Sequence, residues 1–189
     1  MPASLVATDL ACRRGERLLF RGLSLSLGPG EACHIAGTNG IGKSSLIRLL
    51  AGLARPFSGT VKRDGAVALL DENHALDPQA DLGTALAFWS ALDTADHPLT
   101  RLGISALIDV PVRYLSTGQK KRAAFARLIG QGAPIWLLDE PLNGLDSGGV
   151  QLVEGLLADH LSGGGIAVVA SHQPFVSSAA VLPLAEFAA

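Results

Sequence analysis

The glycine-rich segment GTNGIGKS at residues 37–44 restricts the fold of this chain more than any other feature. It follows an apolar run, ACHIA, typical of a strand, and it precedes residues 43–53, whose apolar side chains recur at helical spacing. A strand, a glycine loop and a helix in this order predict a phosphate-binding loop, because backbone N–H groups and the helix N-terminus attract anions. Both flanks argue against an accidental glycine-rich turn.

The side chains of the loop suit a nucleotide and its metal ion. Lys43 is expected to reach the β and γ phosphates and to take part in catalysis, and Ser44 is expected to bind Mg²⁺. The predicted nucleotide-binding residues of this segment are Gly37, Thr38, Asn39, Gly40, Ile41, Gly42, Lys43, Ser44 and Ser45.

Two carboxylates end a second apolar run, IWLLDE at residues 135–140. This run and IAVVAS at residues 166–171 are typical of strands covered on both faces in a parallel sheet. Ligands bind where such strands end beside a glycine loop, whereas two acids alone would indicate only a solvated strand end. We therefore expect Asp139 to hold Mg²⁺, directly or through water, and Glu140 to orient or deprotonate the attacking water.

Composition limits the class of protein. Of the 189 residues, 48% are hydrophobic and 17% are charged, so one compact domain is expected. A net charge of -2 without a block of Lys and Arg favours no nucleic-acid partner. No apolar run reaches the length of a membrane span and no signal peptide is evident, so we expect the protein to stay on the cytoplasmic side. Cys12 and Cys33 are expected to be reduced core residues.

The predicted elements give an α/β fold. Residues 23–27 alternate as in a strand of an N-terminal antiparallel β subdomain, and residues 60–70 predict a hairpin that extends this sheet, with its turn at Asp64 and Gly65. Residues 77–113 favour a small helical insert. The expected fold class is a P-loop NTPase core with a mainly parallel sheet, this β subdomain and the short insert. In this single domain, residues 1–76 and 131–189 form the core and residues 77–130 the insert.

The segment LSTGQKKR at residues 115–122 narrows the family, since most enzymes with a phosphate-binding loop lack it. The chain also contains GTNGIGKS, IWLLDEP, LNGLD and His172 in the same order as the ABC ATPases. With this set of motifs, the chain resembles the ABC ATPase family over nearly its whole length.

This resemblance implies an enzyme that hydrolyses ATP with Mg²⁺ and works as a homodimer on integral membrane permease subunits. Ser116, Gly118 and Gln119 would face the γ-phosphate bound by the opposite subunit, in line with anion binding at a helix N-terminus. Asp146 in LNGLD would touch the other subunit. His172 in ASHQP would sense the γ-phosphate and belong to the catalytic residues.

Two positions depart from the family pattern. Where relatives carry an aromatic residue that stacks on adenine, this chain has Arg14 before Gly15. A guanidinium also stacks on a base, and the alternative for Arg14 is a solvated hairpin residue. Where relatives carry a glutamine that reaches toward Mg²⁺, the chain reads LLDENHALD, and alignment places Asn73 there. Gln79 is the second candidate, and an asparagine that caps the next turn is the structural alternative. The nearby acids and histidine fit known metal-ligand spacings poorly: Asp71, Glu72, His74 and Asp77.

Within the family, the stretch DLACRRGERLLFRGLSLSLGPGE, the ASHQP segment and the short insert are most similar to the haem exporter ATPases of cytochrome c maturation. This narrower resemblance implies a peripheral protein on the cytoplasmic face of the bacterial inner membrane. ATP hydrolysis there would drive haem export, or release of haem from a periplasmic chaperone. An ATPase for another cargo is the main alternative. A DNA-repair or ribosomal ABC ATPase is disfavoured by the short insert and the single phosphate-binding loop, and a regulatory subunit by the presence of Lys43, Glu140 and His172.

Overall fold

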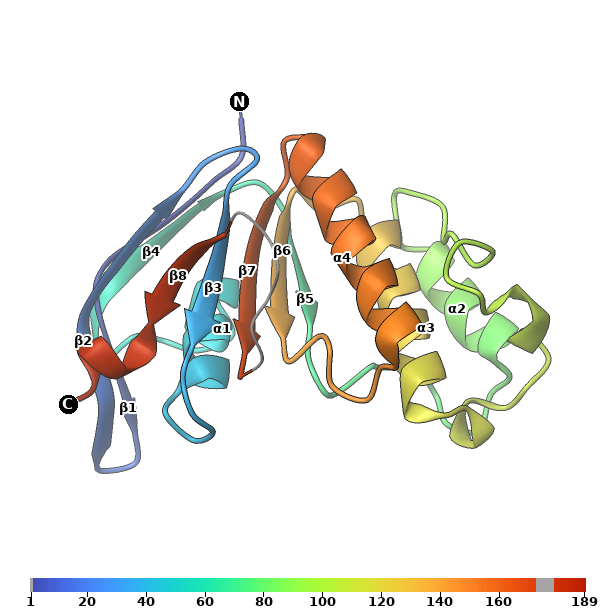
Figure 1. The fold of residues 1–189 in the computed structure, drawn as a ribbon, viewed down its shortest axis with the longest axis horizontal. Helices are drawn as coiled ribbons and strands as arrows, with labels where there is room; N and C mark the ends of the chain where they lie inside the picture. The colour runs from blue at the N-terminus through green and yellow to red at the C-terminus, as the bar shows by residue number, and fades with distance from the viewer. Residues whose placement is uncertain (1, 173–178) are drawn as a thin grey trace.

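The computed structural model describes residues 2–172 and 179–189, which form two sheets with helices packed against them (Figure 1). The N-terminal sheet is antiparallel, with the strand order β2-β1-β4. Its strands are β1 (Ser4–Arg14), β2 (Arg17–Leu27) and β4 (Ser58–Asp64). Leu23 and Leu27 of β2 are buried on the inner face of this sheet. The predicted antiparallel start of the chain is therefore confirmed.

The central sheet is parallel and has the strand order β5-β6-β7-β3-β8. Its strands are β3 (Ala32–Ala36), β5 (Val67–Leu70), β6 (Ile135–Asp139), β7 (Ile166–Ser171) and β8 (Ala180–Pro183). All residues of β6 and β7 are buried, as their continuous apolar runs predict. The α/β fold class with a mainly parallel sheet is confirmed.

Helices cover both faces of the central sheet. They are α1 (Lys43–Ala51), α2 (Leu82–Ser90), α3 (Thr117–Gly130) and α4 (Ser147–Ser162), with 3₁₀ turns at η1 (Ser105–Leu107), η2 (Val112–Tyr114) and η3 (Leu184–Phe187). Successive side chains of β6 point to opposite faces. Ile135 and Leu137 pack with α1 and the antiparallel sheet, whereas Trp136 and Leu138 pack with α3 and α4. The site-bearing end of β6 is thus held between two apolar layers.

The predicted hairpin over residues 60–70 is wrong. β4 pairs with β1 in the antiparallel sheet, whereas β5 pairs in parallel with β6, from Val67 opposite Ile135 to Leu70 opposite Leu138. Gly65 does turn the chain, with a φ of 118°. After this turn the chain enters the central sheet. Every side chain of VALL is apolar, which suits a strand covered on both faces.

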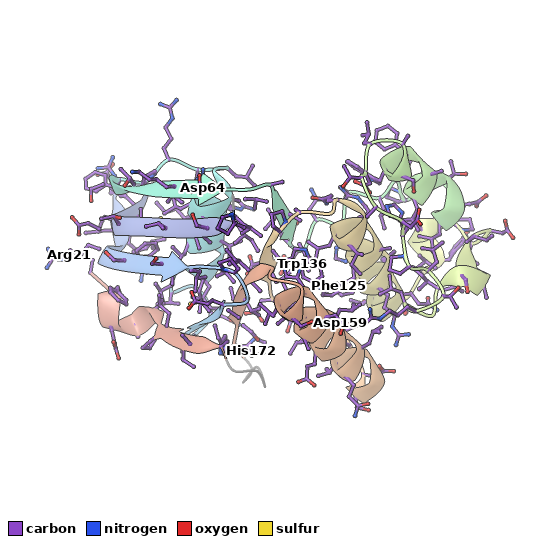
Figure 2. All side chains as sticks on the ribbon, turned by 90° about the horizontal axis from the view of Figure 1, so that it is seen from above. Arg21, Asp64, Phe125, Trp136, Asp159 and His172 are labelled. Atoms are coloured by element: carbon purple, nitrogen blue, oxygen red, sulfur yellow. The ribbon has the colours of Figure 1, made fainter. Side chains whose placement is uncertain are left out.

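The region predicted as a helical insert contains α2, η1, η2 and α3. α2 lies at the end of the molecule away from the antiparallel sheet (Figures 1 and 2). Its Leu86 shares one apolar core with Phe125 and Leu128 of α3 and with Trp136 of β6. Because the region and the sheet share this core, the division of the chain at residues 77 and 130 stays a prediction. Within the described residues, none of the helices is both long and apolar enough to span a membrane.

Both cysteines lie in the core as free thiols. Cys12 is on β1 and Cys33 is on β3. Burial raises the pKa of the Cys33 thiol to about 11, so this thiol is neutral at physiological pH. The expectation of reduced core cysteines agrees with their placement.

Candidate functional site

The glycine-rich loop joins β3 to α1, and its last glycine shapes the start of the helix. Gly42 is the N-cap of α1 with a φ of 119°, and a Cβ there would meet Phe20 at 3.4 Å and Leu19 at 3.5 Å. Glycine adopts this left-handed conformation without strain. The helix has no side-chain cap and no acidic residue in its first turn. Its first N–H groups and its positive end are therefore well placed for an anion.

Lys43 folds back over the loop from the first position of α1. Its side chain is 6% exposed, and Nζ donates to the carbonyls of Gly37 at 2.8 Å and of Thr38 at 3.4 Å. Nζ also forms an ion pair with Oε1 of Glu140 at 3.4 Å. These contacts keep a positive charge at the loop, where phosphate oxygens can replace the carbonyl acceptors.

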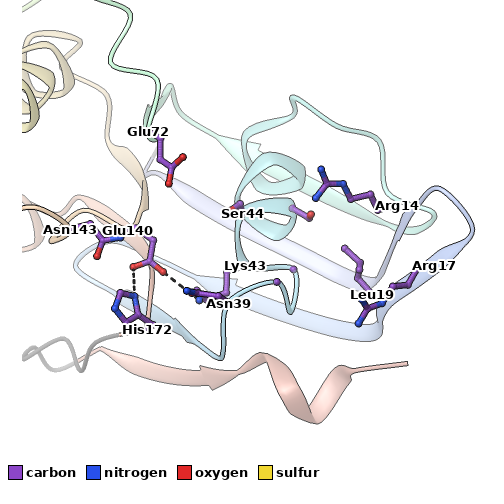
Figure 3. A pocket seen from close by; sticks show the side chains of 13 residues that line it. Arg14, Arg17, Leu19, Asn39, Lys43, Ser44, Glu72, Glu140, Asn143 and His172 are labelled. Carbon is purple, nitrogen blue, oxygen red and sulfur yellow. Dashed lines mark hydrogen bonds and ion pairs between the residues drawn. The ribbon is translucent and has the colours of Figure 1, made fainter. Parts of the chain in front are cut away.

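Glu140 lies between Lys43 and His172 (Figure 3). Its Oε1 faces Lys43, and its Oε2 lies 2.9 Å from Nδ1 of His172, which follows the end of β7. The structure thus brings Lys43 and His172 to the Glu140 carboxylate, so the three side chains predicted as catalytic lie together although they come from distant segments. Gln173 and Pro174 of the ASHQP segment lie outside the described residues.

Asp139 and Ser44 suit a divalent cation. Asp139 is 8% exposed at the end of β6, and its Oδ1 has no hydrogen-bond partner within the described part of the chain. Burial raises the pKa of this carboxyl, a hydrogen bond with the Ser44 side chain opposes the rise, and the Glu140 carboxylate adds to it. A cation held by these oxygens would satisfy the orphaned Oδ1, and Mg²⁺ prefers oxygen ligands of this kind. The residues present fit the ion.

Lys43, Ser44, Glu140 and His172 line a cavity of about 390 Å³, a size typical of ligand pockets, whereas the predicted metal ligand Asp139 is not in the lining. The predicted residues that line it are Arg14, Asn39, Gly40, Gly42, Lys43, Ser44, Ser45, Glu140 and His172. The predicted residues Gly37, Thr38 and Ile41 belong to the same loop but are not in the lining.

Sequence reasoning missed four residues of the lining, namely Arg17, Leu19, Glu72 and Asn143. Two of these four residues could have been found from the sequence. Arg17 pairs directly with Arg14 across the hairpin between β1 and β2, because only Gly15 and Glu16 separate the two strands. Asn143 belongs to the LNGLD segment that was already singled out.

Asn73 is not among the residues that line the cavity, and its proposed contact with the Mg²⁺ shell stays a prediction. Its backbone N–H donates to Oδ1 of Asp71 at 2.9 Å, and its own Oδ1 accepts from the N–H of Ala75 at 3.4 Å, which is the turn-capping role of a loop asparagine. The side chain of Glu72 lines the cavity instead. Gln79 is also outside the lining, and its Oε1 accepts from Arg113. Within the described residues no group of three or more His, Cys, Asp and Glu side chains has the arrangement of a metal site.

The LSTGQ segment lines a second hollow, of about 490 Å³, at the N-terminus of α3. Ser116 Oγ accepts from the N–H of Gln119 at 3.2 Å, and Gln119 Oε1 accepts from the N–H of Ser116 at 2.8 Å, which forms a capping box. Gly118 and Asp146 line the same hollow, and Asp146 caps α4 through the N–H of Gly149 at 2.7 Å. Among the described residues, none lines both hollows. Within one chain, LSTGQ is therefore separate from the phosphate-binding loop.

The comparison with known proteins agrees with this geometry. The family model described as ABC transporter matches residues 20–143, from β2 through the glycine loop and LSTGQ to the end of the Glu140 turn. The chain belongs to the ABC transporter family. This ABC protein is 60% identical over 170 residues to the cytochrome c biogenesis ATP-binding export protein CcmA of Novosphingobium aromaticivorans, a match that covers 90% of this chain and 89% of the relative.

Two further proteins support the family assignment. The CcmA of Sphingopyxis alaskensis is 49% identical, with 91% of each chain covered. Among solved structures, cbiO1 from Clostridium perfringens, part of the ABC transporter complex cbiONQ, matches with a TM-score of 0.72 and 27% identity over 91% of this chain and 80% of that chain. The predicted family and fold of this ABC protein are confirmed.

Proposed function

We propose that this chain is the ATP-binding and ATP-hydrolysing subunit of an export complex in cytochrome c biogenesis. Hydrolysis would power haem export or release of haem from a periplasmic chaperone. Similarity to relatives named CcmA, over about nine tenths of both chains, supports this proposal. In the complex, two copies of the chain would act on integral membrane permease subunits, as a peripheral protein on the cytoplasmic face of the bacterial inner membrane.

The proposal of ATP hydrolysis rests on the position of the Glu140 carboxylate, which lies between Lys43 and His172 at the phosphate-binding loop. Phosphates bound to the loop N–H groups would draw Lys43 away from its carbonyl partners. Glu140 would then orient a water molecule or accept its proton, with His172 keeping the carboxylate turned toward the γ-phosphate. The water oxygen bonds to the γ-phosphorus as the bond to the bridging oxygen breaks, which gives ADP and phosphate.

The metal ion would bind beside the cavity and the base within it. Ser44 and Asp139 would hold Mg²⁺, which when bound neutralises charge on the β and γ phosphates. Arg14 lies toward the other end of the cavity from Glu140 (Figure 3). Its guanidinium is proposed to stack on adenine.

The second hollow supports a composite site in a homodimer. Ser116, Gly118 and Gln119 of the second copy would face the γ-phosphate bound by the first, because a capped helix N-terminus is suited to an anion. Closure of two chains around two ATP molecules would then be the step that acts on the membrane partner.

Two variants test the assigned roles. Lys43→Ala should abolish or severely weaken ATP binding, because it removes the buried positive charge at the loop. Glu140→Gln keeps the size of the side chain but removes the base, so hydrolysis should fall by about 10² to 10⁴-fold while ATP remains bound. Nucleotide binding and phosphate release are measured for both, with Lys62→Ala, an exposed lysine on β4, as the control. Equal loss of binding in the two site variants would contradict these roles.

The biological role needs a separate test. A bacterial strain that lacks this gene is complemented with the wild-type chain or with Glu140→Gln. We expect covalently bound haem in c-type cytochromes, measured by haem staining, to return only with the wild-type chain. Normal c-type cytochromes in the uncomplemented strain would indicate another cargo for the same ATPase.

A further inference from the structure

Lys121 is a buried lysine that the functions above do not use. It lies on α3, five positions after Ser116, and is 4% exposed. It is not among the residues that line the cavity. Lysine is rarely buried without a partner of opposite charge or a hydrogen-bond acceptor, so its contacts need an explanation.

The contacts of Lys121 converge on Glu140. Nζ donates to the main-chain carbonyl of Glu140 at 3.1 Å, and the N–H of Asn143 reaches the same carbonyl at 3.4 Å. The backbone of Glu140 is left-handed, with a φ of 47°, a conformation that non-glycine residues seldom adopt. On the other side of the residue, its N–H donates to the carbonyl of Ala170 at 2.8 Å. Hydrogen bonds from α3 and to β7 thus hold both peptide groups of this strained residue.

The positive charge of Lys121 also interacts with carboxylates around Glu140. Burial lowers the pKa of Lys121, and the carboxylates of Glu72, Asp139, Glu140 and Asp71 oppose this fall. Several of these carboxylates lie near the phosphate-binding loop, where phosphates would add further negative charge. Lys43 is the first cation at this place, and it is already bound to the carbonyls of the loop. Lys121 therefore supplies a second fixed cation from behind the carboxylates, on the helix that starts at the LSTGQ segment.

We propose that Lys121 is a positioning residue for hydrolysis: its ammonium fixes the left-handed Glu140 peptide, and so aims the Glu140 carboxylate at the attacking water. The proposal rests on the proposed ATPase function and deepens it. It also makes α3 a direct mechanical link between LSTGQ and the catalytic carboxylate of the same chain. Lys121 acts through Glu140 and touches neither nucleotide nor water.

The test uses the full chain and separates catalysis from binding. Lys121→Met keeps the aliphatic length but removes the charge and the donor. We expect its kcat for ATP to fall by about 10- to 100-fold, a loss typical of a misplaced catalytic group, while the KM and the Kd for ATP stay unchanged. Lys121→Arg, which keeps a donor and the charge, should restore much of the rate. Lys120→Met is the matched control on the same turn, since Lys120 donates to the Arg113 carbonyl at 3.5 Å and not to Glu140, and it should keep the wild-type rate.

A double-mutant cycle decides whether the effect passes through Glu140. If it does, Lys121→Met should cause no further loss in the Glu140→Gln background, whereas independent effects would multiply. Should Lys121→Met fold poorly, Lys121→Met combined with Glu72→Gln balances the lost charge, and it should still hydrolyse more slowly than Glu72→Gln alone. A Lys121→Met protein with the wild-type kcat, or one that loses ATP affinity instead, overturns the proposal. An inactive wild-type chain would refute the ATPase function itself, which is a different result.

Discussion

At Glu140 the backbone leaves the extended conformation of β6 and enters the left-handed region. For a residue other than glycine this conformation costs roughly 1–3 kcal/mol and persists only where the surroundings hold it. Here the change of direction brings the side chain to Lys43 and His172 instead of into the next layer of the sheet. The left-handed turn at Glu140 thus accompanies contacts of its carboxylate with two other segments of the chain.

Arg14 and Arg17 lie directly opposite each other on the hairpin between β1 and β2. Like charges in this arrangement destabilise a hairpin, and a nearby anion would relieve the repulsion. If Arg14 stacks on adenine, Arg14→Ala should raise the Kd for ATP by about 2- to 5-fold, and Arg14→Tyr should restore affinity through the same stacking. The measurement is nucleotide binding at fixed salt. Arg21→Ala, an exposed arginine of β2 outside the cavity lining, is the control (Figure 2).

Inorganic triphosphate separates stacking from charge. It lacks a base, so its binding should weaken equally in Arg14→Ala and Arg14→Tyr. If ATP affinity also falls equally in both variants, Arg14 contributes only its charge, and the stacking assignment is wrong.

His160 predicts a pH dependence of stability. Its ring stacks on Trp136 at 3.8 Å, and Nε2 donates to the carbonyl of Ile166 at 3.1 Å. Burial lowers the pKa of His160 despite this hydrogen bond, so the unfolded chain takes up a proton first as the pH falls through the ordinary value of about 6.5. The free energy of unfolding should therefore decrease from pH 7.5 toward pH 5.5. His160→Phe keeps the stacked ring and cannot be protonated.

Urea unfolding at several pH values checks this prediction. The His160→Phe protein should show a smaller loss of stability between pH 7.5 and pH 5.5, whatever its stability at high pH. Part of the loss should remain, because burial also lowers the pKa of His74. An unchanged pH dependence would mean that His160 is not buried in its neutral form.

Functional residues could be predicted where all their binding groups lie in one short segment of the sequence. The phosphate-binding loop is recognisable because its binding groups are the backbone and side chains of one short segment, and Asp139 and Glu140 are tied to it by strand pairing. Asn73 was placed by its distance from a strand, but the direction of a loop side chain depends on neighbours that the spacing does not show. In the structure Asp71 accepts from its N–H, and Glu72 faces the cavity instead.

At the scale of elements, replacing two helical glycines by alanine should change the stability of the protein in opposite directions. Gly155 lies in α4 with open space around an added Cβ, so Gly155→Ala should stabilise the protein by about 1 kcal/mol through helix propensity. At Gly130 of α3 the same gain is outweighed, because the added Cβ would lie 2.3 Å from His97 and 2.7 Å from Asp93. Those two side chains are buried and paired at 2.6 Å, so they have little freedom to move.

Thermal unfolding compares the two variants directly. Gly155→Ala should raise the Tm by roughly 2–4 °C, and Gly130→Ala should lower it through overpacking of about 1–3 kcal/mol. A higher Tm for both proteins would show that Asp93 and His97 move aside easily and that the packing of α3 in this region is loose.

Helices and strands with a clear hydrophobic pattern could be predicted from the sequence. The strands that they pair with were harder to predict. The apolar runs of β6 and β7 and the helical spacing of α1 indicate both the type of element and its burial. β5 has four apolar residues after an Asp-Gly turn, and this pattern fits a hairpin as well as a crossover between sheets. What decides is the open edge of β6, which comes far later in the sequence and pairs with Val67 and its neighbours.

At the scale of the whole molecule, each chain carries two hollows that share none of the described residues. The phosphate-binding loop with Glu140 lines one hollow, and the LSTGQ helix lines the other. A head-to-tail pair of chains would join the loop of one copy to the LSTGQ of the second, and two-fold symmetry would form two such sites at once. An alternative in which each chain hydrolyses ATP alone leaves the second hollow without a role.

Mixed dimers of two inactive variants distinguish these arrangements. Lys43→Ala removes the phosphate contact, and Gly118→Asp places a negative charge in the first turn of α3, where it suits the helix but repels a phosphate. Co-expression with two different tags allows purification of dimers that contain one chain of each variant. In such a dimer the intact loop of one chain meets the intact LSTGQ of the other, so we expect up to about half of the wild-type hydrolysis, while each variant alone stays inactive. Mixed dimers that are as inactive as their parents would show that one chain must supply both the loop and LSTGQ to the same ATP.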